Sequence, residues 1–419
     1  MLELLNRKKI LTILLLIIVL VTSVVTAIDG GDFDVYLDAA KKLSENLNIY
    51  TPPFVRGLQY YYSPFFAWIL MPFSKHIFIT ELFWSLLSYA LLYRTFILFL
   101  GYFDTVSLSR KEYILWILLI ALLSFQFIMY NVAMIQVTIF LLWAIFESLN
   151  QVFKGKYILG GFILGLAINI KLMPVLLLPF LFYRGYFKAL SVAILTFALL
   201  LYLPAIGLGI GFNSFLLSEW WAIINPSNKE HVIEAGIGTH SIVSLLPVYL
   251  TETIGEMNYK RNVLNLDFQA VELIVNISRL FILALSLIYL RTLPFKKETN
   301  KLKLLWEISF FAITIPLLFP HQQKYAFIMA IPMISYLVYF FIVTFKFKKT
   351  KGYKVAFYTF VISMIIYSPL YGSDIIGSFL FRLTQHYRFL SFSSLLVIPI
   401  SIYCSPKRIF KIKEKQNNK

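Results

Sequence analysis

The chain contains a series of long apolar runs. A bilayer core of about 30 Å takes roughly 20 helical residues to cross, and the first run, residues 10–28, has about that length. The runs are rich in Leu, Ile and Phe and lack the period-2 alternation of barrel strands. Only 14% of the residues are charged, against about 25% in soluble domains. The sequence therefore predicts an all-α, multi-pass membrane protein.

The apolar runs and the segments between them define the expected organisation. We expect spans at residues 10–28, 80–100, 113–130, 132–149, 157–170, 187–207, 272–290, 304–319, 325–345, 355–371 and 389–404, with a short return run at 175–183. This makes a bundle of about 11–12 transmembrane helices. No low-complexity linker divides the chain, so we expect one membrane domain over 1–419. Two segments are too long to be simple connections and form large outer loops at 29–79 and 208–271.

Charge gives the expected orientation. Arg7, Lys8 and Lys9 precede the first span, and basic residues remain more frequent on the segments that would then be inside. Both termini are expected to be cytoplasmic, in a bacterial-type inner membrane. The same bias explains much of the net charge of +17 without a nucleic-acid partner, and the basic tail at 405–419 would contact anionic membrane lipids. Val25-Thr26-Ala27 also resembles a signal-peptide cleavage site, but the apolar region is longer than usual, which favours a retained anchor.

The first outer loop begins with a pattern typical of an amphipathic helix. Its expected apolar face contains Phe33, Tyr36, Ala40, Leu43 and Leu47. Its expected polar face contains Asp34, Asp38, Lys41, Lys42 and Glu45. The spacing predicts a helix lying in the membrane interface.

Asp32 stands at the start of this helix and has two compatible interpretations. It could cap the helix by accepting backbone N–H bonds, or act as a general base at the membrane surface, where a helix start keeps a carboxylate ionised. Asp34 and Asp29 are alternative carboxylates, the first on the polar face and the second at the end of the first span. Asp32 and Asp34 also fit the DxD pattern of metal-dependent transferases, although helical geometry would turn them apart.

Aromatic and basic residues provide further candidates. Tyr62 lies in a run of three tyrosines that indicates either an interfacial aromatic belt or a surface for sugar rings. Lys171 lies between two apolar runs, where a cation either marks a functional site or extends to the surface. His321 and Lys324 offer two phosphate contacts at one turn, or belong to an exposed loop.

We expect no metal site and no cofactor. The five histidines lack the i, i+4 spacing of a helical zinc site, and the chain has one cysteine, Cys404, which excludes an internal disulfide and a cysteine-based metal site. There is also no glycine-rich nucleotide loop.

Three ordered motifs carry a resemblance to a known family. The first consists of Asp32, Val35-Tyr36, Ala39-Ala40, Tyr50, Tyr62-Ser63-Pro64 and Pro72. The second consists of Gly160-Gly161, Gly165, Lys171 and Pro174, and the third of Pro320-His321 and Tyr325. In this order the motifs resemble glycosyltransferase family 87, the polyprenyl-phosphate-mannose-dependent α-mannosyltransferases of the GT-C superfamily. The chain departs from the family pattern at Ser63, at Ile135-Gln136 and at His240-Ser241.

The resemblance implies a GT-C-like fold and transfer of a hexose, mannose in this family, from a polyprenyl-phosphate donor to a hydroxyl of a lipid or glycan acceptor, with inversion, on the extracytoplasmic face. It implies Asp32 as the base and Lys171, His321 and Lys324 as phosphate contacts, with Tyr36 and Tyr62 near the substrate. Glu234, in the second outer loop, is the next candidate for the base after the aspartates.

Two other functions share the membrane architecture. A transporter or a lipid or polysaccharide flippase would also have many helices and an intramembrane cation such as Lys171, but it should carry more ionisable residues within its spans and show related halves. A noncatalytic partner in polysaccharide assembly is the third candidate. Acids and histidines instead concentrate in the expected outer loops, which favours the enzyme.

Overall fold

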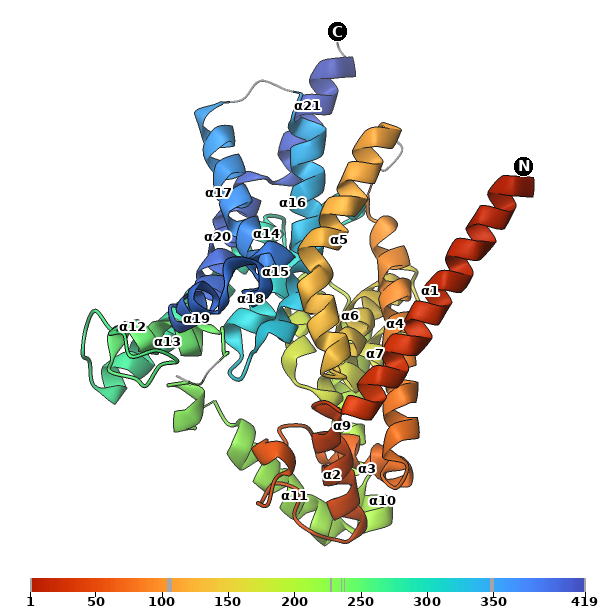
Figure 1. Ribbon diagram of the computed structural model, residues 1–419, viewed down its shortest axis with the longest axis vertical. Coiled ribbons are helices and arrows are strands. Elements are labelled where there is room, and N and C mark those ends of the chain that lie inside the picture. Colours follow the sequence, from red (N-terminus) through yellow and green to blue (C-terminus); the bar gives the residue numbers. More distant parts are fainter. Residues whose placement is uncertain are drawn as a thin grey trace. The chain divides into compact units, whose positions relative to one another are not determined.

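The regular structure of the chain is helical. The computed structural model describes residues 2–103, 108–226, 228–234, 236, 238–346 and 350–417. Over these ranges all regular elements are helices, and one isolated β-bridge joins Thr239 to Gln323. Figure 1 shows long helices together with short ones. The prediction of an all-α protein is confirmed.

Seven helices in the described residues are long and apolar enough to cross a membrane. They are Lys9–Asp29, Ile77–Leu100, Arg110–Ala133, Phe187–Leu208, Phe268–Leu290, Lys324–Thr344 and Phe389–Lys411. Shorter apolar helices are Pro64–Phe73, Thr138–Phe153, Tyr157–Ile170 and Met173–Tyr183. The chain is therefore an integral membrane protein, as predicted, while the count of 11–12 crossings and the cytoplasmic termini stay predictions.

The contacts divide the chain into two units made of interleaved segments. Unit 1 comprises Met1–Leu98, Met129–Pro174 and Lys188–Ile224. Unit 2 comprises Phe99–Ile128, Val175–Phe187 and Asn225–Lys419. The single membrane domain expected from the sequence stays a prediction.

Unit 1 combines long helices with the expected interfacial helix. Its helices are α1 (Leu2–Asp29), α2 (Phe33–Ser44), α3 (Pro64–Leu70), α4 (Ile77–Leu100), α6 (Thr138–Phe153), α7 (Tyr157–Ile170), α9 (Phe187–Tyr202), α10 (Ala205–Leu208) and α11 (Ile210–Ile224), with 3₁₀ turns η1 (Val55–Gly57), η2 (Met71–Phe73) and η4 (Met173–Leu176). Helix α3 packs against both α2 and α11, beyond the end of α1 (Figure 1).

Small residues allow α7 and α9 to approach closely within unit 1. A Cβ on Gly161 would lie 2.5 Å from the carbonyl oxygen of Ala189, and a Cβ on Gly165 would lie 2.5 Å from that of Ala193. Glycines four residues apart on one helix face thus meet alanines four residues apart on the other, a packing typical of membrane helices. This contact fixes the end of α7, where Lys171 follows.

Helix α2 largely confirms the predicted apolar face. Phe33, Tyr36, Ala40 and Leu43 are buried, as expected. Leu47 was assigned to the same face, but it is 49% exposed. The reason is that α2 ends at Ser44, so Leu47 no longer follows the helical period.

Unit 2 is built around two helices that are buried almost throughout, α15 (Lys301–Leu318) and α16 (Ile331–Thr344). Its other helices are most of α5 (Arg110–Ala133), α8 (Leu177–Tyr183), α12 (Ile242–Leu250), α13 (Phe268–Ala284), α14 (Ser286–Leu290), α17 (Lys351–Tyr367), α18 (Ser373–Ile376), α19 (Ser378–His386), α20 (Phe389–Tyr403) and α21 (Pro406–Asn417), with 3₁₀ turns η5 (Lys229–His231), η6 (Lys324–Ala330) and η7 (Pro369–Tyr371).

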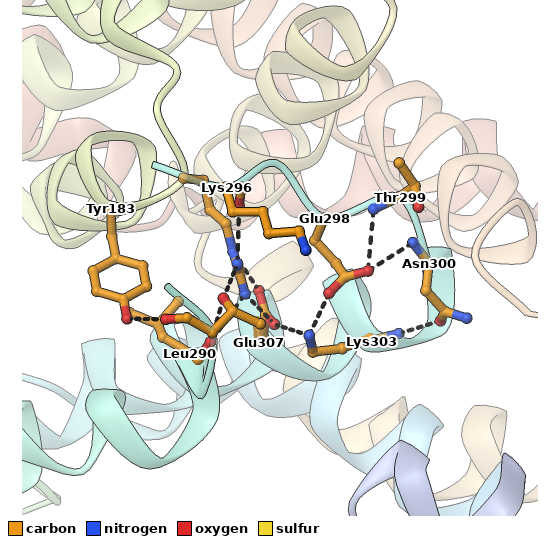
Figure 2. Close-up of polar contacts among 10 residues, drawn as sticks. Tyr183, Leu290, Lys296, Glu298, Thr299, Asn300, Lys303 and Glu307 are labelled. Carbon is orange, nitrogen blue, oxygen red and sulfur yellow. Dashed lines mark hydrogen bonds and ion pairs between the residues drawn. The ribbon is translucent and has the colours of Figure 1, made fainter. Parts of the chain in front are cut away.

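A buried ion pair joins α8 to α15 inside unit 2 (Figure 2). Arg184 Nη2 lies 2.5 Å from Glu307 Oε1, and Arg184 Nε donates to Glu307 Oε2 at 3.0 Å. Both side chains are 0% exposed. Arg184 Nη1 also donates to Thr292 Oγ1 at 2.5 Å, so the guanidinium is compensated by a carboxylate and by further acceptors. Lys303, one turn before Glu307 on α15, pairs with Glu298.

Two sequence boundaries need revision. The segment 208–271 was expected to be a loop, but it contains α11, α12 and the start of α13. The span expected at 132–149 is displaced, because α6 runs from Thr138 to Phe153. Ile135 has a left-handed backbone with φ of 49°, which separates α5 from α6. The boundary expected at residue 131 lies too early, because hydropathy does not report the backbone angles that end a helix.

Candidate active site

Asp32 is positioned by a close approach of two backbone segments in unit 1. Gly30 has φ of +67°, which favours glycine. A Cβ on Gly31 would lie 2.5 Å from the carbonyl oxygen of Met134, and the Asp32 amide donates to that same oxygen at 2.9 Å. The chain between α1 and α2 therefore lies against the turn between α5 and α6. This contact brings Asp32 next to Gln136.

The Asp32 carboxylate accepts a short hydrogen bond from Gln136 Nε2 at its Oδ2 atom. Asp32 occupies the N-cap position of α2, but its side chain makes no capping bond to the helix. The side chain is thus used for a contact with Gln136 and not as a cap. Burial raises the pKa of Asp32, while Lys171 and Gln136 act in the opposite direction.

A chain of hydrogen bonds leads from this carboxylate to Lys171. Tyr36 Oη donates to Gln136 Oε1 at 3.4 Å, and the hydroxyl groups of Tyr36 and Tyr62 lie 2.6 Å apart. Lys171 Nζ donates to Tyr62 Oη at 3.4 Å and lies 5.2 Å from the centroid of that ring. The donors can therefore all point in one direction, from the ammonium group through two phenols and an amide to the carboxylate. Four residues predicted from the sequence lie in this one cluster.

Lys171 lies where α7 ends. Helix α7 finishes at Ile170, Lys171 has extended backbone angles, and Pro174 prevents direct continuation of the helix. The sequence predicted a span at 157–170 followed by a separate short run at 175–183, and α7 does end before η4 begins. Burial lowers the pKa of Lys171 to about 8, against the opposing effect of Asp32.

Ser63, which replaces a proline of the family pattern, connects the two sides of this cluster. Its hydroxyl caps α3 by accepting from the Phe66 amide at 3.4 Å and donates to Asn169 Oδ1 at 2.8 Å. Ser63 directly follows Tyr62, and Asn169 lies two residues before Lys171. The departure from the family pattern therefore creates a side-chain contact between α3 and α7 beside the Tyr62–Lys171 bond.

The alternative carboxylates of the first loop have other surroundings. Asp34 Oδ2 forms an ion pair with Arg56 Nη2 at 2.8 Å, and Asp38 pairs with Lys42 at 3.3 Å. Asp29 is exposed at the end of α1, and its carbonyl oxygen accepts from Arg56 at 3.3 Å. Among the residues that the structure describes, no group of three or more His, Cys, Asp and Glu side chains could hold a metal ion.

Unit 2 contains a second polar cluster, around His321. Glu234 Oε1 lies 2.8 Å from His321 Nδ1, and Glu234 Oε2 accepts from the His321 backbone amide at 2.8 Å. His321 has φ of 56°, a left-handed conformation that costs about 1–3 kcal/mol in a residue other than glycine. The ring of His231 packs edge-on against that of His321, with centroids 5.2 Å apart.

Other basic residues surround a buried histidine of unit 2. Burial, with smaller contributions from Arg388 and Lys324, lowers the pKa of His240 to about 3, so His240 is neutral. Lys324 is half-buried at the start of η6. Of the predicted phosphate contacts, His321 and Lys324 thus belong to unit 2, whereas Lys171 belongs to unit 1.

Two contacts were not foreseen from the sequence. Gln136 was noted only as part of a departure from the family pattern, yet it donates to Asp32. A glutamine between two apolar runs was the signal that could have found it. Glu234 was a candidate base, and its pairing with His321 was not expected.

Comparison with known proteins supports the family assignment. The sequence model of glycosyltransferase family 87 matches residues 60–320, which is more than half of the chain. The match includes Tyr62, Gln136, Lys171 and Glu234, whereas Asp32 lies before it. No curated protein and no solved structure matches the chain. The protein belongs to glycosyltransferase family 87.

Proposed function

We propose that this membrane glycosyltransferase transfers a hexose, mannose, from a polyprenyl-phosphate donor to a hydroxyl of a lipid or glycan acceptor. The reaction takes place with inversion, on the extracytoplasmic face of the cell membrane, in a GT-C-like fold with both termini in the cytoplasm. Membership of the family supports sugar transfer. The spanning helices suit a donor and an acceptor that reside in the bilayer.

The observation that carries the proposal is the cluster of Asp32, Gln136, Tyr36, Tyr62 and Lys171 in unit 1. It combines a half-buried carboxylate with an ammonium group at the other end of one hydrogen-bond chain. A raised pKa makes Asp32 a stronger base than an exposed aspartate. Lys171 supplies the positive charge that a phosphate needs.

The proposed chemistry uses these groups in one displacement. The acceptor oxygen attacks the anomeric carbon while Asp32 takes the hydroxyl proton, and the bond from that carbon to the phosphate oxygen breaks. The electron pair of this bond leaves with polyprenyl phosphate. The leaving group is a charged phosphate, so it requires cations and no general acid. Lys171 is the proposed cation of unit 1, His321 and Lys324 of unit 2 stay predicted phosphate contacts, and the proposal needs no metal or nucleotide.

Reconstituted protein provides the test. Proteoliposomes containing the purified chain would be incubated with radiolabelled polyprenyl-phosphate mannose and membrane lipid extract as acceptor. Labelled glycolipid should form from this donor and not from a nucleotide sugar. Movement of intact donor across the bilayer without sugar transfer would instead identify a flippase.

A further inference from the structure

A groove with a volume of about 570 Å³ lies between α7 and α9 of unit 1. Ile158 and Phe162 of α7 line one side, and Val192 and Thr196 of α9 line the other. Residues four apart lie on one face of a helix, so each pair covers one turn and the groove follows the two helices. Its volume is in the range of ligand sites, about 300–1,000 Å³. Space for a ligand is therefore present within a single unit.

The apolar side of this groove is open to the surroundings of the protein. Ile158 is 61% exposed, and Leu159 and Phe162, which also line the groove, are exposed as well. Helix α7 is one of the shorter apolar helices, and α9 belongs to a helix long and apolar enough to cross a membrane. The surroundings of these side chains are therefore lipid chains, and an acyl chain suits this part of the groove.

Two lysines line the groove at the end where both helices begin. Lys156 directly precedes α7, and Lys188 is the second residue of α9. The two helices begin at the same end because their glycine contacts advance in the same direction along both of them. Both lysine side chains are exposed, and among the residues that the structure describes no acidic side chain lines the groove. Their charges also add to the positive ends of the helix macrodipoles. This end of the groove therefore favours an anion.

We propose that the groove binds a phospholipid with an anionic headgroup, whose phosphate lies at the end lined by Lys156 and Lys188. One acyl chain of this lipid lies along the apolar side chains of Ile158 and Val192. Tyr157 also lines the groove, and tyrosine is enriched at the level of lipid headgroups. Basic pockets between membrane helices are typical sites for anionic headgroups.

This lipid site is separate from the candidate active site. Lys156 precedes α7 and Lys171 follows it, and the helix has 14 residues. At 1.5 Å per residue the helix is about 21 Å long, so the groove lysines and the Asp32–Lys171 cluster lie at opposite ends of α7. The inference goes beyond the proposed function and does not rest on it, because the bound phospholipid is neither the sugar donor nor the acceptor.

A second copy of the chain fits this groove less well than a lipid. A two-fold symmetric contact places the same surface patch of both copies face to face. It would bring Lys156 and Lys188 of one copy close to the same lysines of the other, and such like-charge contacts are unfavourable. The charge of the groove therefore favours an anionic lipid as its occupant.

Native mass spectrometry of delipidated protein in a neutral detergent tests the proposal by counting bound lipids. The added probes are dioleoyl phosphatidylglycerol, which is anionic, and dioleoyl phosphatidylcholine, which has the same chains and no net charge. A lysine near a membrane surface should change the affinity for an anionic lipid about fivefold, so two lysines should give the wild type a preference of about 25-fold. This preference should weaken as the salt concentration rises.

The variants separate the groove from general surface charge. Lys156→Gln and Lys188→Gln should each weaken phosphatidylglycerol binding about fivefold and leave phosphatidylcholine binding nearly unchanged. Lys154→Gln is the matched control, because Lys154 is an exposed lysine of the same turn that does not line the groove. It should keep the wild-type preference. Ile158→Asn places a polar group on the apolar side and should weaken the binding of both lipids.

A headgroup without chains completes the experiment. Glycerol 3-phosphate at the same concentration should not displace bound phosphatidylglycerol, and displacement would show a phosphate site in place of a lipid site. Equal retention of both lipids by the wild type at every salt concentration would overturn the proposal, even if a variant failed to fold. Equal losses in Lys154→Gln and Lys156→Gln would overturn it as well, and a dimer that excludes the lipid would assign the groove to a second copy.

Discussion

The two units hold their carboxylates in different ways. In unit 1, Asp32 receives a neutral amide donor at Oδ2, and the nearest cation of its hydrogen-bond chain, Lys171, lies at the other end. In unit 2, Glu234 and Glu307 each give both oxygens to a single basic residue, His321 or Arg184. A carboxylate bonded to an amide can still take up a proton. A carboxylate engaged by a basic residue on both oxygens acts mainly on that residue.

This difference favours Asp32 over Glu234 as the proposed base. Asp32 and Glu234 are both acids of segments expected to lie outside the membrane, and sequence patterns ranked them only by the resemblance to the family. Their partners distinguish them physically, since both oxygens of Glu234 are already engaged by His321. We therefore expect substitutions at the two sites to differ in kind: loss of turnover at Asp32, and loss of stability at the acids of unit 2.

Asp32→Asn should have the largest effect on activity. Asparagine keeps the shape and can still accept from Gln136, but it cannot take a proton at neutral pH. Loss of a general base costs about 10²–10⁴-fold in rate, so kcat should fall by that factor while donor KM changes little. Turnover of a radiolabelled lipid donor by protein in proteoliposomes measures both.

The control for this variant is Asp29→Asn, which changes an exposed carboxylate three residues earlier. It should retain near-normal turnover and the same melting temperature. An Asp32→Asn protein as active as this control would remove Asp32 from the mechanism and reopen the choice between the two units.

Glu307→Gln should have the largest effect on stability. It leaves Arg184 buried without its ionic partner, and breaking a buried pair costs about 3–5 kcal/mol. The melting temperature of detergent-solubilised protein should therefore fall markedly. Asp374→Asn, at an exposed position of unit 2, is the matched control and should melt like the wild type. Equal melting temperatures for both variants would show that the buried pair of unit 2 is not a stabilising contact.

The next largest effect is expected from a substitution at Lys171, which should weaken donor binding. Because burial lowers its pKa to about 8, the ammonium loses its charge as the pH rises through about 8, and donor affinity should fall over the same range. Lys171→Ala should raise donor KM by about 10- to 100-fold at pH 7, the range expected for a hydrogen bond to a charged group, and should abolish this pH dependence. Donor KM measured from pH 6.5 to 9 tests both statements, and a wild-type KM that stays constant across pH 8 would contradict them.

The individual residues of this site were predictable from the sequence, whereas the side-chain contacts between them were not. Asp32, Tyr36, Tyr62 and Lys171 stood out as polar or aromatic residues at the ends of apolar runs, and they do lie in one cluster. Hydropathy also identified most spanning helices, since a bilayer sets their length. The roles assigned to these residues stay predictions.

Contacts between residues that are far apart in the chain leave no periodic pattern in the local sequence. Gln136 lies 104 residues from Asp32, and Glu234 lies 87 residues from His321. Their contacts depend on how the helices pack, as with the close approach of Gly31 to Met134. The break between α5 and α6 was expected at residue 131 and lies at Ile135 for a related reason, because hydropathy does not report backbone angles.

The smallest effect is expected at the ion pair of Asp34 and Arg56, which completes the comparison inside unit 1. Their side chains are 24% and 43% exposed, and such surface pairs contribute about 0–1 kcal/mol. Asp34→Asn should therefore change the melting temperature little and alter kcat by less than about twofold, because the carboxylate that accepts from Gln136 is unchanged. Raising the salt concentration should weaken the wild-type pair in the same way, since exposed charges are screened. A large loss of kcat in Asp34→Asn, with normal folding, would mean that the carboxylate paired with Arg56 is the base, and that an ion pair does not exclude that role in either unit.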